Sequence, residues 1–176
     1  MTTSFVVHLG LGSNVGERLQ HLERGVLELR REGVHASRLS RVWVGAYVGT
    51  GPAQPEYLNA VVEAHTSLAP LDLLARTQSV EARCGRPPGT HLRPRTLDID
   101  ILFFGGWIIR NSRLVVPHPR LAARRFVLEP LHDVAGLENP AWPGLAAQLQ
   151  LLRKQQPLQV YGALRLRPED REASHA

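Results

Sequence analysis

The chain has 176 residues and a mass of 19.5 kDa, which favours one domain over two independent cores. Hydrophobic residues make up 43% and charged residues 21%, values typical of a globular protein. The single cysteine, Cys84, excludes an intramolecular disulfide framework and a cysteine-cluster zinc site. No signal peptide is evident, and no segment approaches the roughly 20 apolar residues of a membrane span. We therefore expect a cytoplasmic protein without a membrane partner.

Positive charge is concentrated in one part of the sequence. Residues 83–125 hold nine arginines and only two carboxylates, a net charge of +7, whereas the whole chain carries +5. An anionic partner is therefore expected at this region rather than over the whole surface.

The N-terminal segment predicts a strand, a turn and a helix. Residues 5–9 (FVVHL) predict a strand that ends in a glycine-containing turn at 10–13. Asn14 and Glu17 have the spacing of a helix capping box. Apolar residues at helical spacing follow, and the helix should end at Gly33.

The remaining sequence predicts more strands than helices. The expected strands are 38–48, 57–66, 96–104, 107–110 and 160–166, and the expected helices are 70–84, a short arginine-rich one after Pro119, and 141–152. Pro70 suits the first turn of its helix, which Gly85 should end. This order predicts an α+β fold with a mainly antiparallel sheet and helices packed on one face. We expect a single domain over residues 1–167 and a frayed tail over 168–176.

The N-terminal glycines do not form a nucleotide-binding fingerprint. Gly10, Gly12 and Gly16 depart from G-x-G-x-x-G, because Val15 stands where the third glycine belongs. No Gly-Lys-Ser/Thr occurs, and the only lysine is Lys154. A tight turn from strand to helix explains these glycines better than a cofactor loop.

The sharpest chemical signal is Asp98-Ile99-Asp100. Residues two apart on a strand point to the same face, so both carboxylates project together while Ile99 is buried. Paired carboxylates repel each other unless a cation lies between them, and Mg²⁺ prefers such oxygen ligands. The alternative is an exposed polar strand face. The surrounding arginines favour a magnesium site that handles phosphates.

Three further residues suit recognition of a heterocycle. Tyr57 and Asn59 share one face of a predicted strand, and an asparagine amide offers both donors and an acceptor to a ring edge. The ring of Phe126 could stack on such a heterocycle. Without further context, core packing of the aromatic rings and a structural role for Asn59 explain these three residues better. His118, between two prolines, would also more often be structural than functional.

Four segments read together resemble the 6-hydroxymethyl-7,8-dihydropterin pyrophosphokinase family of folate biosynthesis. The segments are LGLGSNVGERLQHL at 9–22, QPEYLNAVV at 54–62, RPRTLDIDILFFG at 93–105 and VVPHPRLAARRFVLEPL at 115–131. The resemblance covers about residues 5–135 in the family's order. It implies a ferredoxin-like α+β fold. It also implies a monomer that transfers pyrophosphate from ATP to the pterin hydroxymethyl group and releases AMP.

The resemblance also implies a role for each residue at a matching position. Arg86 and Arg95 resemble the catalytic arginines of a mobile loop, and Asp98 and Asp100 resemble the ligands of two Mg²⁺ ions. The positions that match ATP contacts are Gln78, Glu81, Ile101, Arg113, His118 and Arg124. The positions that match pterin contacts are Gly45, Val48, Tyr57, Asn59 and Phe126.

The chain departs from the family pattern at two places in particular. Leu92-Arg93 replaces the usual Trp-Gly, so an aromatic ring that closes over the substrates is missing. Gly45-Ala46 replaces the usual Thr-Pro, so a hydroxyl is absent from the pterin side. These changes bear on affinity and loop closure rather than on the type of reaction.

Two other interpretations stay open from the sequence. Ferredoxin-like sheets with basic loops also bind single-stranded RNA through strand aromatics. The chain lacks the characteristic RNA-binding stretch, and Asp98 and Asp100 would repel a phosphate backbone, so we expect no nucleic-acid partner. The second interpretation is a family member that has lost its activity through the loop changes.

Overall fold

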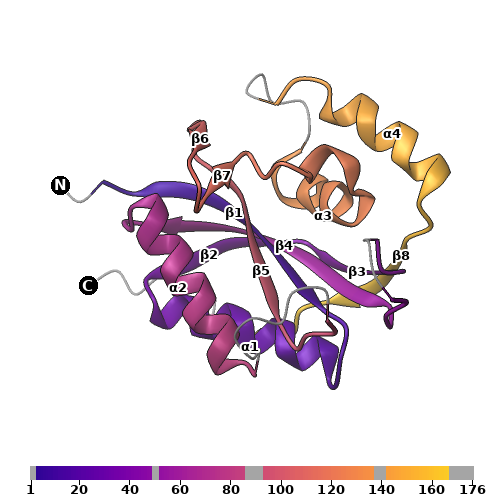
Figure 1. Ribbon diagram of the computed structural model, residues 1–176, viewed down its shortest axis with the longest axis horizontal. Coiled ribbons are helices and arrows are strands. Elements are labelled where there is room, and N and C mark those ends of the chain that lie inside the picture. Colours follow the sequence, from indigo (N-terminus) through magenta and orange to yellow (C-terminus); the bar gives the residue numbers. More distant parts are fainter. Residues whose placement is uncertain (1–2, 49–51, 86–92, 137–141, 167–176) are drawn as a thin grey trace.

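The computed structural model describes residues 3–48, 52–85, 93–136 and 142–166, and its centre is a six-stranded antiparallel sheet (Figure 1). Its strands are β1 (Phe5–Ser13), β2 (Val34–Leu39), β3 (Arg41–Gly45), β4 (Tyr57–Thr66), β5 (Asp98–Phe104) and β8 (Gln159–Ala163). The strand order is β5-β1-β4-β3-β8, and β2 also pairs with β4. A separate hairpin joins β6 (Ile109–Arg110) to β7 (Val115–Val116). The antiparallel α+β prediction is confirmed.

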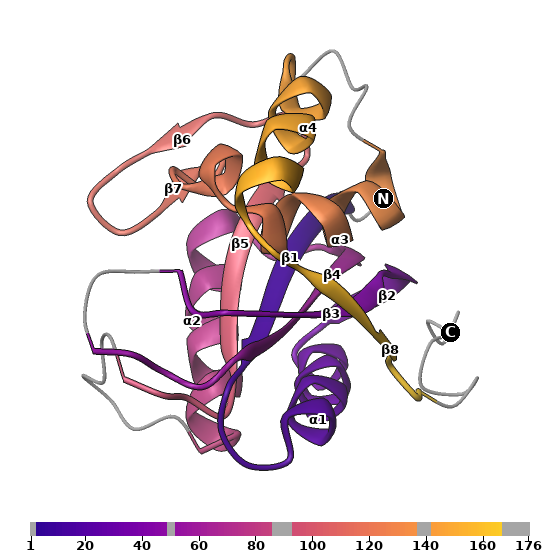
Figure 2. The ribbon, with the colours of Figure 1, turned by 90° about the vertical axis from the view of Figure 1, so that its right-hand side faces the viewer.

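Helices cover both faces of the sheet, so the prediction of helices on one face is wrong. Helices α1 (Arg18–Arg31) and α2 (Pro70–Arg83) pack on one face (Figure 1). The other face carries the short 3₁₀ helix η1 (Leu121–Ala123) and helix α3 (Arg125–Ala135). Helix α4 (Leu145–Gln155) stacks outside α3 and leads into β8 beside β3 (Figure 2).

Two-sided burial of the sheet explains the second helical layer. On β4, Leu58 and Val62 join the core under α1 and α2, whereas Val61 joins a second apolar cluster under α3 and α4. A strand that is apolar on both faces must be covered on both faces. The sequence FVLEPL, at the start of α3, supplies that cover with buried Val127 and Leu128.

A bulge in β5 brings two successive side chains to the α3 face. His8 pairs with Phe103 and Leu9 pairs with Ile101, so Leu102 has no partner on β1. Leu102 and Phe103 therefore both lie in the cluster under α3, while Phe104 returns to the core under α1 and α2. Before the bulge, alternation keeps Asp98 and Asp100 on the α3 face.

The start of α1 differs from the sequence prediction. The strand β1 continues through Ser13, so Gly10 and Gly12 lie inside the strand rather than in a turn. The helix begins at Arg18, and Glu17 at its N-cap makes no side-chain capping bond. Asn14 instead bonds to residues distant in the sequence, so the capping-box prediction is wrong.

The predicted strand 38–48 and the C-terminal segments also differ in extent. Ser40 interrupts this strand and separates β2 from β3; its hydroxyl accepts a hydrogen bond from the backbone N–H of Val61 at 2.8 Å. Strand β8 ends at Ala163, and the predicted tail 168–176 lies outside the described residues. In the described ranges no helix combines the length and apolar character needed to cross a membrane.

Candidate active site

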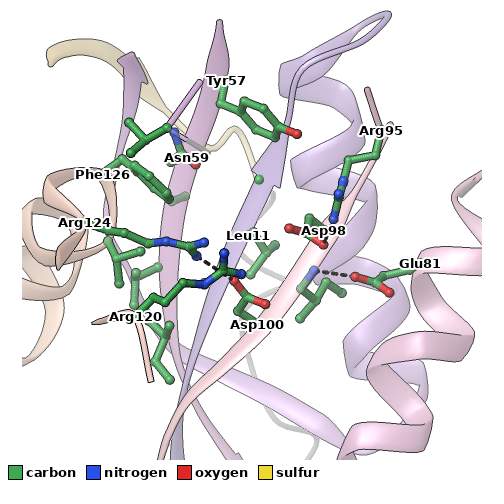
Figure 3. A pocket seen from close by; sticks show the side chains of 18 of the residues that line it. Leu11, Tyr57, Asn59, Glu81, Arg95, Asp98, Asp100, Arg120, Arg124 and Phe126 are labelled. Carbon is green, nitrogen blue, oxygen red and sulfur yellow. Dashed lines mark hydrogen bonds and ion pairs between the residues drawn. The ribbon is translucent and has the colours of Figure 1, made fainter. Parts of the chain in front are cut away.

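A cavity of about 350 Å³ opens on the α3 face of the sheet, at the end where the glycines of β1 lie (Figure 3). It brings together ten of the residues that the sequence singled out. They are Val48, Tyr57, Asn59, Gln78, Glu81, Arg95, Asp98, Asp100, Arg124 and Phe126. These residues come from segments spread over 79 positions of the chain, from Val48 to Phe126, so the fold rather than the local sequence assembles the site.

Strand register sets the width of the cavity. Gly12 pairs with Asn59 of β4 on one side and with Asp98 of β5 on the other, so the three residues form one row on one face. Neighbouring strands are about 4.8 Å apart, which places Asn59 and Asp98 about 10 Å apart across the row. A Cβ at Gly12 would lie 3.4 Å from the Tyr57 ring and 3.5 Å from Asn59 Oδ1. Glycine at this position therefore leaves the space between Asn59 and Asp98 free of a side chain.

The two carboxylates on β5 have different surroundings. Asp98 Oδ1 accepts a hydrogen bond from Arg95 Nη1 at 2.7 Å. Burial, followed by the negative charge of Asp98, raises the pKa of Asp100 to about 6, and the nearby arginines only partly oppose this shift. Asp100 is therefore a carboxylate whose charge is under-compensated at neutral pH.

His118 and Arg124 lie on the other side of Asp100. Arg124 Nη1 is 3.6 Å and His118 Nε2 is 3.8 Å from Asp100 Oδ2. Burial and the charges of Arg124 and Arg120 lower the pKa of His118 to about 4, so its imidazole is neutral at pH 7. Its Nδ1 accepts a hydrogen bond from the Arg120 backbone N–H at 3.2 Å, which assigns the ring proton to Nε2, facing Asp100.

Asn14 ties two loops of the cavity together. Its Oδ1 accepts a hydrogen bond from the Arg95 backbone N–H at 2.8 Å, and its own N–H donates to the Arg95 carbonyl at 3.2 Å. Its Nδ2 donates to Gln54 Oε1 at 3.0 Å. The Tyr57 hydroxyl donates to the same Gln54 oxygen at 3.4 Å. The segment that carries Arg95 is thus joined to the segment that leads into Tyr57.

The aromatic wall lies opposite the carboxylates (Figure 3). Tyr47 and Tyr57 stack with ring centroids 6.2 Å apart and an interplanar angle of 27°. The guanidinium of Arg124 lies 5.4 Å from the centre of the Phe126 ring. The cavity therefore offers aromatic faces and the Asn59 amide on one side, and charged groups on the other.

Glu81 has a structural contact at the edge of the cavity. Its Oε1 accepts a hydrogen bond from the Ile99 backbone N–H at 2.7 Å, which fixes α2 against the start of β5. Gln78, one turn earlier on α2, also lines the cavity. The predicted ATP roles of both residues stay predictions.

Four predicted site residues within the described ranges do not line the cavity. Ile101 packs in the core under α1 and α2, and Arg113 lies exposed at the turn between β6 and β7. Gly45 ends β3, where a Cβ would come within 2.6 Å of Leu158. His118 reaches the site only through Asp100. Arg86, the second predicted catalytic arginine, lies outside the described residues, as does Leu92.

The cavity also has lining residues that the sequence argument missed. They include Gly10, Gly12, Tyr47 and Arg120. The alternation of Gly10-Leu11-Gly12 was the signal in the sequence that could have indicated the cavity. The Leu11 side chain is buried on one face of β1, and the two glycines place no side chain on the other face. Arg120 belongs to the arginine-rich region, but the sequence did not distinguish it from its neighbours.

The residues present fit a divalent cation only in combination with a phosphate ligand. Within the described residues, no three His, Cys, Asp or Glu side chains gather into a metal-binding group. Two carboxylates on one strand face, one of them with a raised pKa, match the partial coordination that Mg²⁺ accepts when phosphates and waters supply the other ligands. The donor set therefore suits Mg²⁺ bound with a nucleotide.

Comparison with known proteins agrees with this geometry. A family model described as 7,8-dihydro-6-hydroxymethylpterin-pyrophosphokinase matches residues 8–136, which include every described residue of both walls. The chain belongs to this family. The family resemblance inferred from the four sequence segments is confirmed.

Individual relatives include both single enzymes and larger bifunctional proteins. The chain is 41% identical over 132 residues to the 2-amino-4-hydroxy-6-hydroxymethyldihydropteridine pyrophosphokinase of Pseudomonas aeruginosa, covering 73% of this chain and 80% of that protein. It is 38% identical over 130 residues to the Bacillus subtilis protein of the same name, covering 73% and 77%. It is 40% identical over 132 residues to the mitochondrial folate synthesis bifunctional protein of Pisum sativum, covering 74% of this chain. The chain spans only 25% of the pea protein.

A solved structure shows the same fold. The crystal structure of Plasmodium falciparum HPPK-DHPS with pteroate superposes with a TM-score of 0.66 at 12% identity, covering 88% of this chain and 46% of that one. This likeness concerns the fold alone. The pyrophosphokinase family assignment itself depends on the family match and on the relatives with higher identity.

Proposed function

We propose that the chain is a 2-amino-4-hydroxy-6-hydroxymethyldihydropteridine pyrophosphokinase. It transfers pyrophosphate from ATP to the hydroxymethyl group of 6-hydroxymethyl-7,8-dihydropterin and gives AMP and the diphosphate ester. The observation that carries the proposal is one cavity in which a carboxylate pair with arginines faces an aromatic and amide wall about 10 Å away. These are the chemistries that a nucleotide phosphate chain and a flat heterocycle require.

The wall formed by β4 and α3 holds the pterin. Asn59, buried to 6% exposure, directs its amide into the cavity beside Gly12 and matches the donors and acceptors of the ring edge. Tyr57 and Phe126 provide apolar faces for stacking. Together they fix the hydroxymethyl oxygen on the side of the cavity that faces β5.

The charged wall holds ATP. Arg95 and Arg124 flank the carboxylates from opposite sides, so their guanidinium groups grip a phosphate chain that lies between them. The hydroxymethyl oxygen forms a bond to the β-phosphorus, and the bond from this phosphorus to the oxygen shared with the α-phosphate breaks. AMP leaves with that oxygen and the hydroxyl proton passes to solvent. Arginines near the breaking bond stabilise the negative charge that develops there.

Asp98 and Asp100 would hold two Mg²⁺ ions that arrive with ATP. When bound, these ions screen the phosphate charge and bring the attacking oxygen and the phosphorus into line. The two carboxylates share one strand face, which positions them to hold ions on the same side of the nucleotide. Positioning and electrostatics carry phosphoryl-type transfers of this kind.

The proposal extends to architecture and assembly. The chain order β1, α1, β2 with β3, β4, α2, β5 and the sheet order β5-β1-β4-β3 match a ferredoxin-like arrangement once β2 and β3 count as one interrupted strand. Helices α3 and α4 are additions to that core. The monomer that the family resemblance implies is proposed as the active unit.

One assay tests the function directly. The purified chain is incubated with Mg²⁺, ATP and 6-hydroxymethyl-7,8-dihydropterin, and nucleotides are quantified by chromatography. AMP and the pterin diphosphate ester should form in equal amounts, and AMP should not form without the pterin. Release of ADP, or no pterin-dependent AMP, would show that the proposal is wrong.

A further inference from the structure

Arg120 lines the cavity, but none of the substrate contacts proposed above uses its side chain. Its guanidinium points toward Asp100 beside that of Arg124, as Figure 3 shows. Arg124 makes the ion pair with Asp100, at 3.6 Å. In the described part of the chain no carboxylate makes an ion pair with Arg120. Arg120 therefore acts on Asp100 through its charge, while Arg124 makes the ion-pair contact.

The backbone at Arg120 is fixed in place by a tight set of hydrogen bonds. Its N–H donates to His118 Nδ1 at 3.2 Å, and its carbonyl accepts from the Ala123 N–H at 3.2 Å. The His118 N–H donates to the Leu102 carbonyl at 3.0 Å, which ties this segment to β5. Leu121, the next residue, is buried in the apolar cluster under α3. The side chain is thus exposed while its origin is held rigidly beside Asp100.

Charge in this part of the cavity is unbalanced. Arg95, Arg120 and Arg124 bring three positive charges around the two carboxylates of β5. The positive charge of Arg120 lowers the pKa of Arg124, after the effect of burial, so these like charges are close enough to repel each other. An anion that enters between them relieves this repulsion.

The position of Arg120 distinguishes it from the other arginines of this region. Arg93, Arg110 and Arg113 are exposed and do not line the cavity. Arg120 lies across Asp100 from Arg95, so an elongated polyanion that contacts Arg95 at one end can reach Arg120 at the other (Figure 3). A guanidinium offers paired donors that match phosphate oxygens.

We propose that Arg120 binds the phosphate chain of the nucleotide on the side of Asp100 opposite Arg95, and thereby makes the site prefer a triphosphate to a monophosphate. This inference rests on the proposed function, because it takes ATP as the substrate. The Arg120 side chain becomes ordered when the nucleotide binds. Arg124, already paired with Asp100, then holds the same end of the chain more deeply.

The test measures nucleotide binding by calorimetry with the full chain and Mg²⁺. The ligands are a non-hydrolysable ATP analogue and AMP, and the variants are Arg120→Ala, Arg120→Lys and the control Arg110→Ala, which changes an exposed arginine outside the cavity. Arg120→Ala should weaken the ATP analogue about tenfold, since it removes charge-assisted hydrogen bonds. It should leave AMP binding nearly unchanged. Arg120→Lys should retain part of the affinity, and Arg110→Ala all of it.

The outcomes separate this inference from the function on which it rests. The role of Arg120 is overturned if Arg120→Ala binds the ATP analogue as tightly as the wild type does, or if its affinity for AMP falls as much as its affinity for the ATP analogue. Either result leaves the proposed function intact as long as the wild-type enzyme releases AMP in the assay. Failure of the wild type to bind the ATP analogue overturns both proposals. Unfolding temperatures of all variants should match the wild type; if Arg120→Ala proves unstable, the Arg120→Lys comparison decides.

Discussion

Asn14 and Arg95 are 81 positions apart in the sequence and are joined by two hydrogen bonds, one from each backbone N–H. The side chain of Asn14 also bonds to Gln54, whose amide oxygen accepts the Tyr57 hydroxyl. One buried amide therefore links the arginine that faces the carboxylates to an aromatic residue of the opposite wall. In the proposed enzyme, it couples the geometry of the two substrates.

Asn14→Ala is expected to lower kcat by more than its effect on folding explains. The substitution leaves the Arg95 N–H without its acceptor and removes one of the two donors to the Gln54 oxygen, at a cost of about 1–3 kcal/mol in the free energy of unfolding. It also loosens Arg95 relative to Tyr57. Steady-state kinetics and urea unfolding should be measured together.

Asn111→Ala is the matched control for Asn14→Ala. Asn111 Oδ1 accepts hydrogen bonds from the backbone N–H groups of Arg113 and Leu114 in the hairpin between β6 and β7, away from the cavity. Its loss should reduce stability without reducing kcat. If both variants lose activity only in proportion to stability, Asn14 has a structural role alone.

The sequence predicts the orientation of the two carboxylates on β5, but it does not predict that the glycines of β1 line the cavity. Strict strand alternation places Asp98 and Asp100 on one face, and the structure confirms that Ile99 is buried on the other, where Leu97 and Ile101 are buried as well. Gly10 and Gly12 predict a turn, because glycine is typical of turns. Their function in β1 depends on the registers with β4 and β5, which are set by pairing between distant strands.

The second helical layer was also beyond local sequence patterns. The sequence predicts only a short arginine-rich helix after Pro119, whereas the structure has η1 followed by the longer helix α3, with Pro130 inside it. Burial of Glu129 between Arg125 and Arg153 stabilises this helix through contacts with α4. Such contacts form only after the chain has folded, so tertiary packing decided what helix propensity alone did not.

Asp98→Asn and Asp100→Asn should each lower kcat by more than about a hundredfold, because each removes a charge that holds Mg²⁺. The fold of both variants should survive.

The pKa of Asp100 is raised to about 6 in the folded state, whereas the ordinary pKa of an aspartate is 3.8. Between these two pH values the folded chain therefore binds more protons than the unfolded chain. Ionised Asp100 therefore destabilises the fold as pH rises through this range. At pH 7.5, Asp100→Asn should unfold at an equal or higher temperature than the wild type.

Asp133→Asn provides the contrast to these two substitutions. Asp133 accepts hydrogen bonds from the Arg41 side chain and from Trp43 Nε1, and it does not line the cavity. This variant should lose stability and keep its kcat. A drop in unfolding temperature for Asp98→Asn and Asp100→Asn, matched to their loss of activity, would argue for a structural role of the carboxylates.

Asn59→Ala should weaken pterin binding and leave ATP binding nearly unchanged. It removes the amide that faces the ring edge. The binding free energy of the pterin should become less favourable by about 1–3 kcal/mol where water is excluded from the site. Calorimetric titration with the pterin, and separately with an ATP analogue, measures both effects. Equal affinity of the wild type and the variant for the pterin removes Asn59 from the substrate site.

The free energy of unfolding should decrease as pH falls below about 6.5 because of His8. Burial lowers the pKa of His8 from its ordinary value of 6.5, although Glu63 opposes the shift. Its Nε2 lies 3.4 Å from Glu63, and the ring contacts Trp142 edge-on at 5.4 Å between centroids. Below pH 6.5 the unfolded chain binds a proton that the folded chain does not, so acid favours unfolding.

His8→Gln is the variant that isolates this pH effect. Glutamine does not titrate and can still bond to Glu63. Urea unfolding of both proteins at several pH values should show a shallower decrease for His8→Gln at acid pH. Parallel curves for the two proteins would exclude His8 as the source.

In the proposed enzyme, Arg95 competes with Mg²⁺ for Asp98. Its Nη1 lies 2.7 Å from Asp98 Oδ1. Burial lowers the pKa of Arg95, but the charge of Asp98, the hydrogen bond to it and weaker contributions from Tyr57 and Glu81 together raise this pKa above its ordinary value. In the absence of nucleotide, Arg95 thus occupies an oxygen that the proposed function assigns to Mg²⁺. When ATP binds, its phosphates offer Arg95 another anion, and Asp98 becomes available to the ion.

Arg95→Ala should therefore change two properties in opposite directions. It should raise the affinity for Mg²⁺ without nucleotide, because a competing positive charge is removed from Asp98, and it should lower kcat, because a phosphate contact formed in the reacting complex is lost. Mn²⁺ titration followed by electron paramagnetic resonance measures the first property, and AMP release measures the second. Arg93→Ala, which changes an exposed arginine two residues earlier that does not line the cavity, should leave both unchanged. Weaker metal binding by Arg95→Ala would show that Arg95 supports Asp98 rather than competing for it.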